Sequence, residues 1–234
     1  SCSSEPCWST IRDLMKELGP KKKNFTDMFR PMMPQKWLKE YNTWLNTNDI
    51  DKVLRQYDKA HPDFYYGGAL PIDFQLKKKN KCVVSDLCNF NLQDHVNNKI
   101  NNIGIVFNTD PHDKEGQHWI SLFINLSGKT LEDKPGIFYF DSYGHKPPSQ
   151  VKDFIDTTIE QGKECGLDFA YLYNNKKYQK GRSQCGLYSI DFILQLLDNV
   201  TFNEYITTKA NDPRIDKLRS VYFINPKGNK KIKQ

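Results

Sequence analysis

The sequence predicts an α+β fold in which a central mixed β-sheet is flanked by helices. Apolar runs rich in β-branched and aromatic residues occur at 103–107, 119–126 and 137–140, separated by Gly, Asp and Pro turns, as is typical of sheet strands. Stretches with helical spacing begin near Ser149 and at Cys185. Strands and helices do not follow a strict βαβ alternation, which favours the α+β class.

Residues 1–68 are predicted to form an N-terminal helical accessory arm, and residues 69–234 a separate core. Apolar residues of the arm recur three and four positions apart, which predicts amphipathic helices. The three predicted helices cover residues 7–18, 34–45 and 47–57. Around 61–71, aromatic, Gly and Pro residues interrupt this spacing, so we place the domain boundary there.

The predicted core ends in a helix, a strand and a second helix. The first helix starts near Ser149 and has one apolar face, and a strand is expected at 167–173. The second helix, from Cys185 to about Asp198, is apolar nearly all round, so it should lie buried against the sheet. Cys185 is therefore expected at the amino-terminal end of a buried helix.

The six cysteines show neither CxxC pairs nor dense, regular spacing, so we expect free thiols in a reducing compartment rather than a disulfide framework or a zinc site. No run approaches the roughly 18 apolar residues of a membrane-spanning helix. The first residues lack the pattern of a secretory signal. We expect a soluble, cytoplasmic protein with no membrane partner, unless a leader has been removed.

The net charge of +6 is partly carried by lysine clusters. The clusters are Lys21 to Lys23, Lys77 to Lys81 (interrupted by Asn80), and Lys227, Lys230, Lys231 and Lys233. Such clusters can attract nucleic acid weakly by releasing counterions. Aromatic residues do not interleave with them as in a single-strand binding groove, and an ordinary solvated surface is the alternative.

Cys185 is the candidate nucleophile. The amino terminus of a helix favours negative charge and lowers the pKa of a thiol there, so that more of the reactive thiolate forms. Gly181 and Gly186 would allow a substrate carbonyl and the oxyanion-binding N–H groups to approach closely. Taken alone, the alternative is a buried structural cysteine, since free cysteines are among the most buried residues.

His118 and Asp141 are candidate partners of this thiol. His118 precedes the apolar run 119–126, and Asp141 follows the run 137–140, so each is expected at a strand end. There a carboxylate could accept a hydrogen bond from the imidazole and fix its tautomer. Four other histidines compete for the role of base and are expected on the surface: His61, His95, His112 and His145.

Three motifs in order, GQHW, FDSYG and QKGRSQCG, resemble those of the superfamily of ubiquitin-like-protein proteases and adenovirus proteinases. Within it the chain is most similar to polyprotein-processing proteases of large nucleocytoplasmic DNA viruses, such as African swine fever virus and poxviruses. The resemblance implies that Cys185 is the nucleophile, His118 the general base and Asp141 the orienting group. It also implies an oxyanion-hole role for Gln179, with Gln184 as the less favoured candidate, and substrate contacts for Trp119 and Gly186.

The resemblance further implies a cysteine endopeptidase that cleaves after Gly-Gly in viral structural polyproteins during virion maturation. It requires no metal or organic cofactor, and its partners would be polypeptides with Gly-Gly-X sites. Such an enzyme would work in the host cytoplasm or viral factory, and also in the virion. Self-cleavage at Gly67-Gly68-Ala69 is a further hypothesis.

Three other functions stay open on the sequence alone. A deubiquitinase or a SUMO/ubiquitin-like-protein deconjugating protease would use the same chemistry, because those modifiers also end in Gly-Gly. Acyl transfer to a hydroxyl or a lysine would depend on acetyl-coenzyme A. A non-enzymatic binding module would be a protease fold that has lost its activity.

Overall fold

The computed structural model describes residues 5–40, 42–131 and 133–225. They divide into two compact units. The core unit comprises 44–216, and the arm unit combines the described parts of 1–43 and 217–234. The sequence placed the boundary between 68 and 69, a position that lies within strand β1 (Phe64–Pro71).

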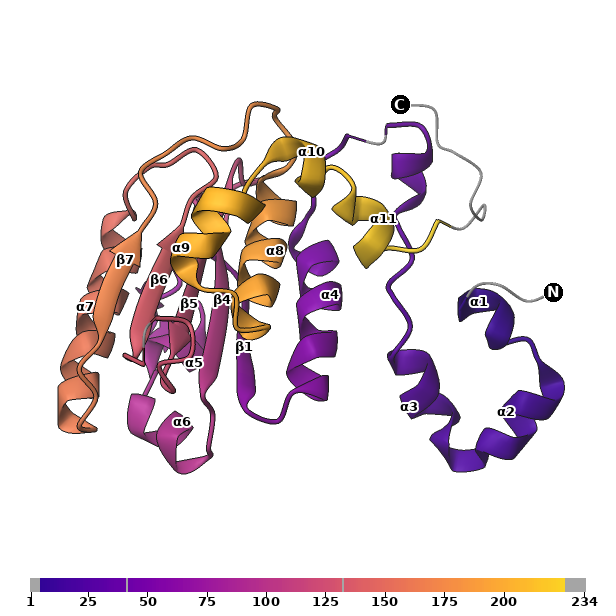
Figure 1. Cartoon of the computed structure of the whole chain (residues 1–234), viewed down its shortest axis with the longest axis horizontal. Coiled ribbons are helices and arrows are strands. Elements are labelled where there is room, and N and C mark those ends of the chain that lie inside the picture. Colours follow the sequence, from indigo (N-terminus) through magenta and orange to yellow (C-terminus); the bar gives the residue numbers. More distant parts are fainter. Residues whose placement is uncertain (1–4, 41, 132, 226–234) are drawn as a thin grey trace. The chain divides into compact units, whose positions relative to one another are not determined.

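The core unit is built on a mixed five-stranded sheet (Figure 1). Its strand order is β1 (Phe64–Pro71), β4 (Asn102–Asn108), β5 (Trp119–Asn125), β6 (Gly136–Phe140) and β7 (Ala170–Tyr173). The pairs β4–β5 and β5–β6 are antiparallel, whereas β1–β4 and β6–β7 are parallel. The predicted α+β class is confirmed.

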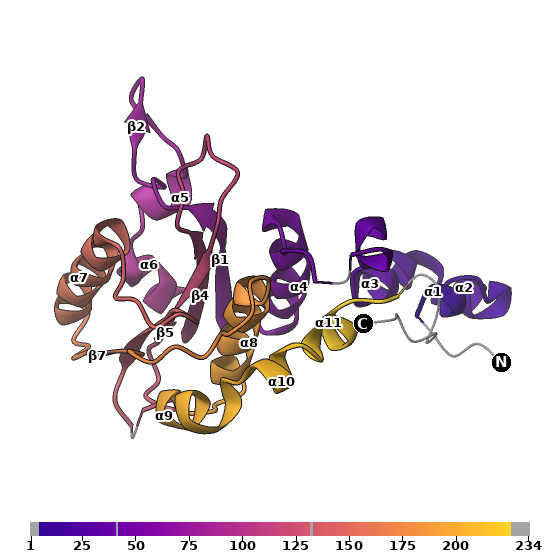
Figure 2. The same ribbon diagram turned by 90° about the horizontal axis from the view of Figure 1, so that it is seen from above.

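Helices cover both faces of the sheet (Figure 2). The helices α5 (Ser85–Cys88), α6 (Leu92–Asn97) and α7 (Ser149–Glu164) lie on one face, and α4 (Thr47–Ala60) and α8 (Cys185–Leu197) on the other. Alternate strand residues point to opposite faces. Ile137 and Tyr139 of β6 join the core that includes α7, whereas Phe140 stacks on Phe192 of α8 with ring centroids 5.1 Å apart.

The helix α8 is buried along nearly its whole length, because its apolar residues leave no polar face. It contacts β5 and is followed by α9 (Phe202–Glu204), the π-helical segment η3 (Tyr205–Lys209) and α10 (Asp212–Ile215). The prediction of a buried helix that begins at Cys185 is therefore confirmed.

Two predictions about the first third were wrong. The helix expected at 34–45 is only the short 3-10 helix η2 (Gln35–Leu38). The segment 61–71 contains β1 rather than only a turn, because its aromatic residues alternate between buried and half-buried positions in the sheet. Gly68 and Ala69 are buried in β1 and paired with β4, so self-cleavage there would require this strand to leave the sheet.

The arm unit joins both ends of the described chain. Its helices are α1 (Glu5–Trp8), α2 (Arg12–Leu18), η1 (Gly19–Lys21), α3 (Lys22–Asp27), η2 and α11 (Leu218–Tyr222). The buried Trp37 packs edge-on against Phe223 at 4.9 Å and lies beneath the Arg219 guanidinium. Arg30 binds Glu5 at 2.6 Å and the Ser220 carbonyl at 3.0 Å. The aromatic residues of the arm thus form a small core of their own.

The expectation of free thiols throughout was wrong. Cys82 and Cys88 form a disulfide that links the hairpin of β2 (Lys77–Lys78) and β3 (Lys81–Cys82) to α5. The hairpin brings together two cysteines whose spacing in the sequence gives no such signal. Cys165 and Cys185 are free.

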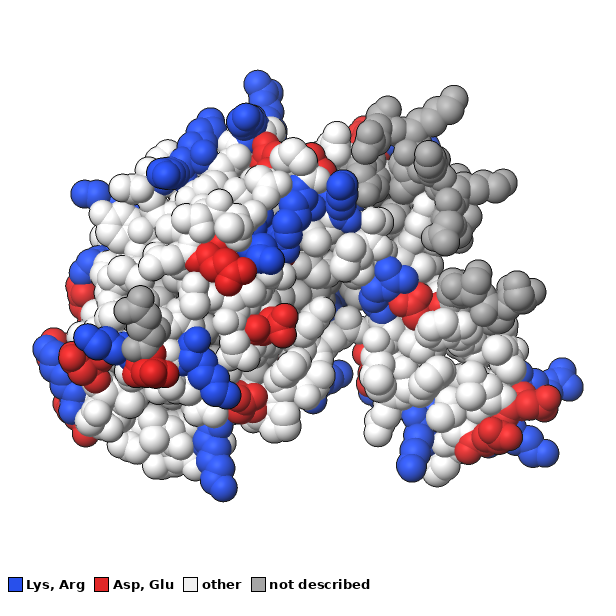
Figure 3. Space-filling model, viewed as in Figure 1, with Lys and Arg blue, Asp and Glu red and all other residues white. Residues whose placement is uncertain are grey.

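The lysine clusters at 21–23 and 77–81 are exposed, and the cluster at 227–233 lies outside the described residues. On the face shown in Figure 3, basic and acidic side chains are interspersed. Weak nucleic-acid contact therefore stays a prediction. None of the helices in the described part of the chain has the length and apolar character needed to cross a membrane.

Candidate active site

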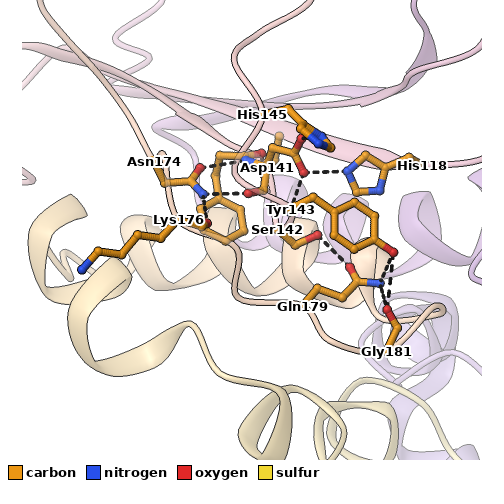
Figure 4. A network of polar contacts seen from close by, with 11 residues as sticks. His118, Asp141, Ser142, Tyr143, His145, Asn174, Lys176, Gln179 and Gly181 are labelled. Atoms are coloured by element: carbon orange, nitrogen blue, oxygen red, sulfur yellow. Dashed lines mark hydrogen bonds and ion pairs between the residues drawn. The ribbon is translucent and has the colours of Figure 1, made fainter.

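Two neighbouring strands bring His118 and Asp141 together. His118 directly precedes β5 and Asp141 directly follows β6. Because the two strands are antiparallel, the start of one lies beside the end of the other. Nε2 of His118 and Oδ1 of Asp141 are 2.6 Å apart (Figure 4), which is a short, charge-assisted hydrogen bond.

Asp141 is held by several donors and is only 2% exposed. Its Oδ1 also accepts from the Tyr143 backbone N–H at 2.8 Å, and its Oδ2 lies 3.1 Å from Nδ1 of His145. The buried Asn174 bonds both backbone groups of Asp141, accepting from its N–H at 2.9 Å and donating to its carbonyl at 2.7 Å. The carboxylate therefore has little freedom to turn away from His118.

Cys185 is the first residue of α8 and is 2% exposed. Burial lowers the pKa of His118, but the hydrogen bond and charge of Asp141 and the nearby Cys185 raise it to about 9. A pKa above neutral favours the protonated imidazole, which can donate a proton during the reaction. Nδ1 of His118 is buried and has no hydrogen-bond partner in proper geometry among the described residues, as is common for catalytic contacts before substrate binds.

Tyr143 covers the imidazole. Its ring stacks on His118 with centroids 4.7 Å apart, and its hydroxyl lies 3.4 Å from the Gly181 carbonyl. The same carbonyl accepts from the Gln179 side chain at 3.0 Å. Tyr143 thus joins the histidine to the loop that precedes Cys185.

Gln179 is fully buried in that loop. Its Oε1 accepts from the Ser142 hydroxyl at 2.7 Å, and its Nε2 donates to Gly181 at 3.0 Å and to the Tyr143 hydroxyl at 3.3 Å. The amide is therefore fixed beside the Asp141 turn (Figure 4). To serve an oxyanion, one of its N–H groups has to exchange a present acceptor for the substrate oxygen.

Gln184, the less favoured oxyanion candidate, is engaged elsewhere. Its Oε1 accepts from the Ser183 backbone N–H at 3.1 Å, and its Nε2 donates to Asp216 at 3.0 Å. The backbone N–H groups at the start of α8 remain candidate oxyanion donors.

Asp212, at the start of α10, fastens the Gln179 loop to α8. One carboxylate oxygen accepts from the backbone N–H groups of Lys180 at 2.7 Å and Gly181 at 3.3 Å. The other accepts from the hydroxyl of Tyr188 on α8 at 2.7 Å. This carboxylate fixes the loop in position relative to the helix that carries Cys185.

Trp119 and Gly186 lie together beside the nucleophile. The indole of Trp119 is 6% exposed and donates to the Leu45 carbonyl at 2.8 Å. A Cβ on Gly186 would come within 2.9 Å of the Leu45 side chain and 3.4 Å of Trp119. The close contact of these side chains with α8 requires glycine at this position.

The structure therefore brings His118, Asp141, Cys185, Gln179, Trp119 and Gly186 into one region of the core unit. Their catalytic roles stay predictions. Sequence reasoning missed Asn174, Asp212 and Tyr143, and it assigned His145 to the ordinary surface. Tyr143 follows the Asp141 turn in the FDSYG motif, which was the one available signal; the contacts of Asn174 and Asp212 depend on folding.

The pH dependence of the reaction tests the His118–Asp141 pair. Acylation requires the imidazolium to protonate the leaving amine, so kcat/KM should fall as pH rises through about 9. Because the pKa of His118 is raised in the folded protein, protonated His118 stabilises the folded state. This contribution to the free energy of unfolding is complete below about pH 6.5 and is lost as the pH rises through about 9. Asp141→Asn should move this limb to lower pH and reduce kcat by up to about 10⁴-fold.

The measurement is kcat and kcat/KM for peptide hydrolysis from pH 6 to 10. His145→Gln is the matched control, because His145 contacts the other oxygen of Asp141 but its side chain is 73% exposed. We expect its profile to resemble that of the wild type. An unmoved alkaline limb in Asp141→Asn would contradict the assignment of this limb to the pair.

A cysteine at the start of a buried helix, beside an imidazole held by a buried carboxylate, defines this protein as a cysteine protease. The chain belongs to the Ulp1 protease family, whose C-terminal catalytic domain matches residues 77–225. The predicted superfamily and the predicted type of enzyme are confirmed, and the reading as a non-enzymatic binding module is set aside.

Similar proteins come from large DNA viruses. A protein of Acanthamoeba polyphaga mimivirus, predicted to be a thiol protease, is 30% identical over 227 residues, covering 96% of this chain and 70% of the relative. A cysteine protease of African swine fever virus is 28% identical over 191 residues, covering 78% of this chain and 68% of the relative. The crystal structure of the African swine fever virus protease has a TM-score of 0.72 and 22% identity, covering 96% of this chain and 84% of that one, which shows a shared fold.

Proposed function

We propose that this protein is a viral endopeptidase that cleaves after Gly-Gly in structural polyproteins during virion maturation. The observation that carries the proposal is the juxtaposition of Cys185, His118 and Asp141, with the 2.6 Å bond between the last two. The similar cysteine proteases of two large DNA viruses support a viral role. The same proposal locates the enzyme in the host cytoplasm or viral factory and in the virion.

The reaction would proceed in two steps. The Cys185 thiolate attacks the glycyl carbonyl carbon, forming a C–S bond, while Gln179 and backbone N–H groups stabilise the oxyanion. His118 donates its proton to the leaving amine as the C–N bond breaks. Neutral His118 then takes a proton from water, and the resulting hydroxide cleaves the thioester to release the acid and regenerate the thiolate–imidazolium pair.

The surroundings of Trp119 support a preference for glycine. The indole N–H bond to Leu45 fixes this ring, and the Leu45 side chain fills the space above Gly186. A rigid aromatic wall beside the nucleophile would favour substrate residues that lack a side chain. A Gly-Gly pair fits such a restricted channel.

The alternative is removal of ubiquitin or a ubiquitin-like modifier. The match to the Ulp1 family favours this reading, and several African swine fever virus relatives carry the name SUMO-1 cysteine protease. The chemistry at Cys185 would be the same. Only recognition of the folded modifier distinguishes this function from polyprotein cleavage.

Paired substrates separate the two functions. One set carries Gly-Gly-X sites from viral structural polyproteins, and the other carries ubiquitin or SUMO joined through its Gly-Gly end. We expect the wild type to cut the first set with the higher kcat/KM and Cys185→Ala to cut neither. Preference for the second set would instead assign deconjugation, and cleavage that persists in Cys185→Ala would contradict both proposals.

A further inference from the structure

A group of exposed cations lies on the two loops that carry the candidate site. One loop follows Asp141 and leads to α7, and the other joins β7 to α8. We define the basic rim by its members, which are Lys146, Lys176, Lys177, Lys180 and Arg182. All of them are exposed, and none makes an ion pair among residues 5–40, 42–131 and 133–225.

The rim is adjacent to the reacting groups. The Lys177 ammonium lies 5.0 Å from the centre of the Tyr143 ring, which itself stacks on His118. The two loops also pack on each other, because a Cβ on Gly144 would come within 2.6 Å of the Lys176 carbonyl. Figure 3 shows basic side chains along the upper edge of the core unit, where the β7–α8 connection runs in Figure 1.

The two loops themselves contain no acidic residue after Asp141. No Asp or Glu occurs between Asp141 and Asp153 or between Asp168 and Asp191. The carboxylates that contact the second loop are Asp212 and Asp216, and their hydrogen bonds go to backbone N–H groups, to the Tyr188 hydroxyl and to the Gln184 amide. None of these carboxylates forms an ion pair with a rim side chain among the described residues.

Because these cations form no ion pair among the described residues, their charge is available to a bound substrate. We propose that the basic rim selects polypeptides with Asp or Glu close to the scissile Gly-Gly bond. Opposite charge at an interface edge mainly raises the association rate and lowers KM. The inference rests on the proposed function, whose substrate class it narrows to acidic cleavage sites.

Nucleic acid is the other polyanion that such a rim could attract. The acidic peptide is favoured because Lys177 lies over the Tyr143 ring, which stacks on His118, so a peptide bound at Cys185 would lie near the rim. The basic rim is also short and confined to two loops. A long basic stripe that could follow a phosphate backbone is not formed by these five residues.

The test uses Gly-Gly-X peptides with Asp on one side of the scissile bond, on the other side or on both, each beside its Asn isostere. An exposed charge pair changes a binding constant by about 1.5- to fivefold, so at low salt KM should be about two- to fivefold lower for the Asp peptide than for its Asn isostere. The advantage should shrink at about 0.5 M salt. Lys176→Glu combined with Arg182→Glu should abolish or invert the Asp/Asn ratio, whereas Lys134→Glu, in the turn that joins β5 to β6 at the opposite end of these strands, should preserve it.

The dissociation constants of the same peptides with Cys185→Ala provide a readout that does not need cleavage. Equal affinity for the Asp and Asn peptides, or a preference that survives the charge reversal, would overturn the inference. A duplex DNA that binds through the rim while the peptides show no charge preference would overturn it too. Cleavage of neither peptide, with the binding preference intact, would instead reject the proposed Gly-Gly activity and leave the rim as an acidic-peptide surface.

Discussion

Replacing Cys185 by alanine should reduce kcat by roughly 10⁴-fold or more on every substrate of the enzyme. The thiol is the candidate nucleophile, and among the described residues Cys165 is the other free cysteine. Cys165 directly follows α7, and its Sγ donates to Oε1 of Gln93 in α6 at 3.4 Å, away from His118. It therefore offers no substitute for the nucleophile.

The same variant should change His118 without unfolding the protein. Cys185 contributes to the raised pKa of His118, which is about 9 in the wild type, so this pKa should be lower in Cys185→Ala. The imidazole NMR signals followed through a pH titration measure it. Cys165→Ala is the control, with wild-type kinetics and an unchanged histidine titration. An active Cys185→Ala enzyme, or an inactive Cys165→Ala enzyme of normal stability, would contradict the assignment.

The pattern of apolar residues predicted the central strands correctly, because residues that suit an extended backbone are also the ones buried there. The strands β4, β5 and β6 lie within a residue or so of the apolar runs that predicted them. In the first third, helices α2 and α4 lie where helices were predicted at 7–18 and 47–57, but the helix predicted at 34–45 was wrong for a physical reason. Helical spacing at 34–45 did not suffice to form a helix, since the arm residues obtain their stability from contacts such as Trp37 with Phe223, which join the two ends of the chain.

The candidate site was predictable where a motif stands at the end of a secondary-structure element. His118, Asp141 and Cys185 each border a strand or a helix, so local pattern placed them. Asn174 acts through a hydrogen bond to Asp141, 33 positions earlier in the chain. Asp212 acts through hydrogen bonds to the second loop, 31 and 32 positions earlier. No local pattern encodes such partners, because the sheet register and the course of the chain after α8 bring them together.

Replacing Gln179 by alanine should lower kcat by about 10²- to 10³-fold, the usual effect of losing one oxyanion donor. KM should change less, because the amide would act on the oxyanion rather than on the ground-state carbonyl. Alkylation of Cys185 by iodoacetamide forms no oxyanion, so its rate should stay near the wild-type value. Ser142→Ala, which removes only the donor to Oε1 of Gln179, should cause a smaller loss.

Asp212 provides a second test of the role of Gln179. Its carboxylate accepts hydrogen bonds from the backbone N–H groups of Lys180 and Gly181 and so holds the loop that carries Gln179. Asp212→Ala alone should reduce kcat, but it should add little once Gln179 is already alanine, since residues that act as a unit are not additive. Thermal melting of each variant separates this effect from unfolding. Full additivity of the two substitutions would show that Asp212 acts independently of the oxyanion site, and an unimpaired Gln179→Ala enzyme would transfer the oxyanion role to the backbone N–H groups at the start of α8.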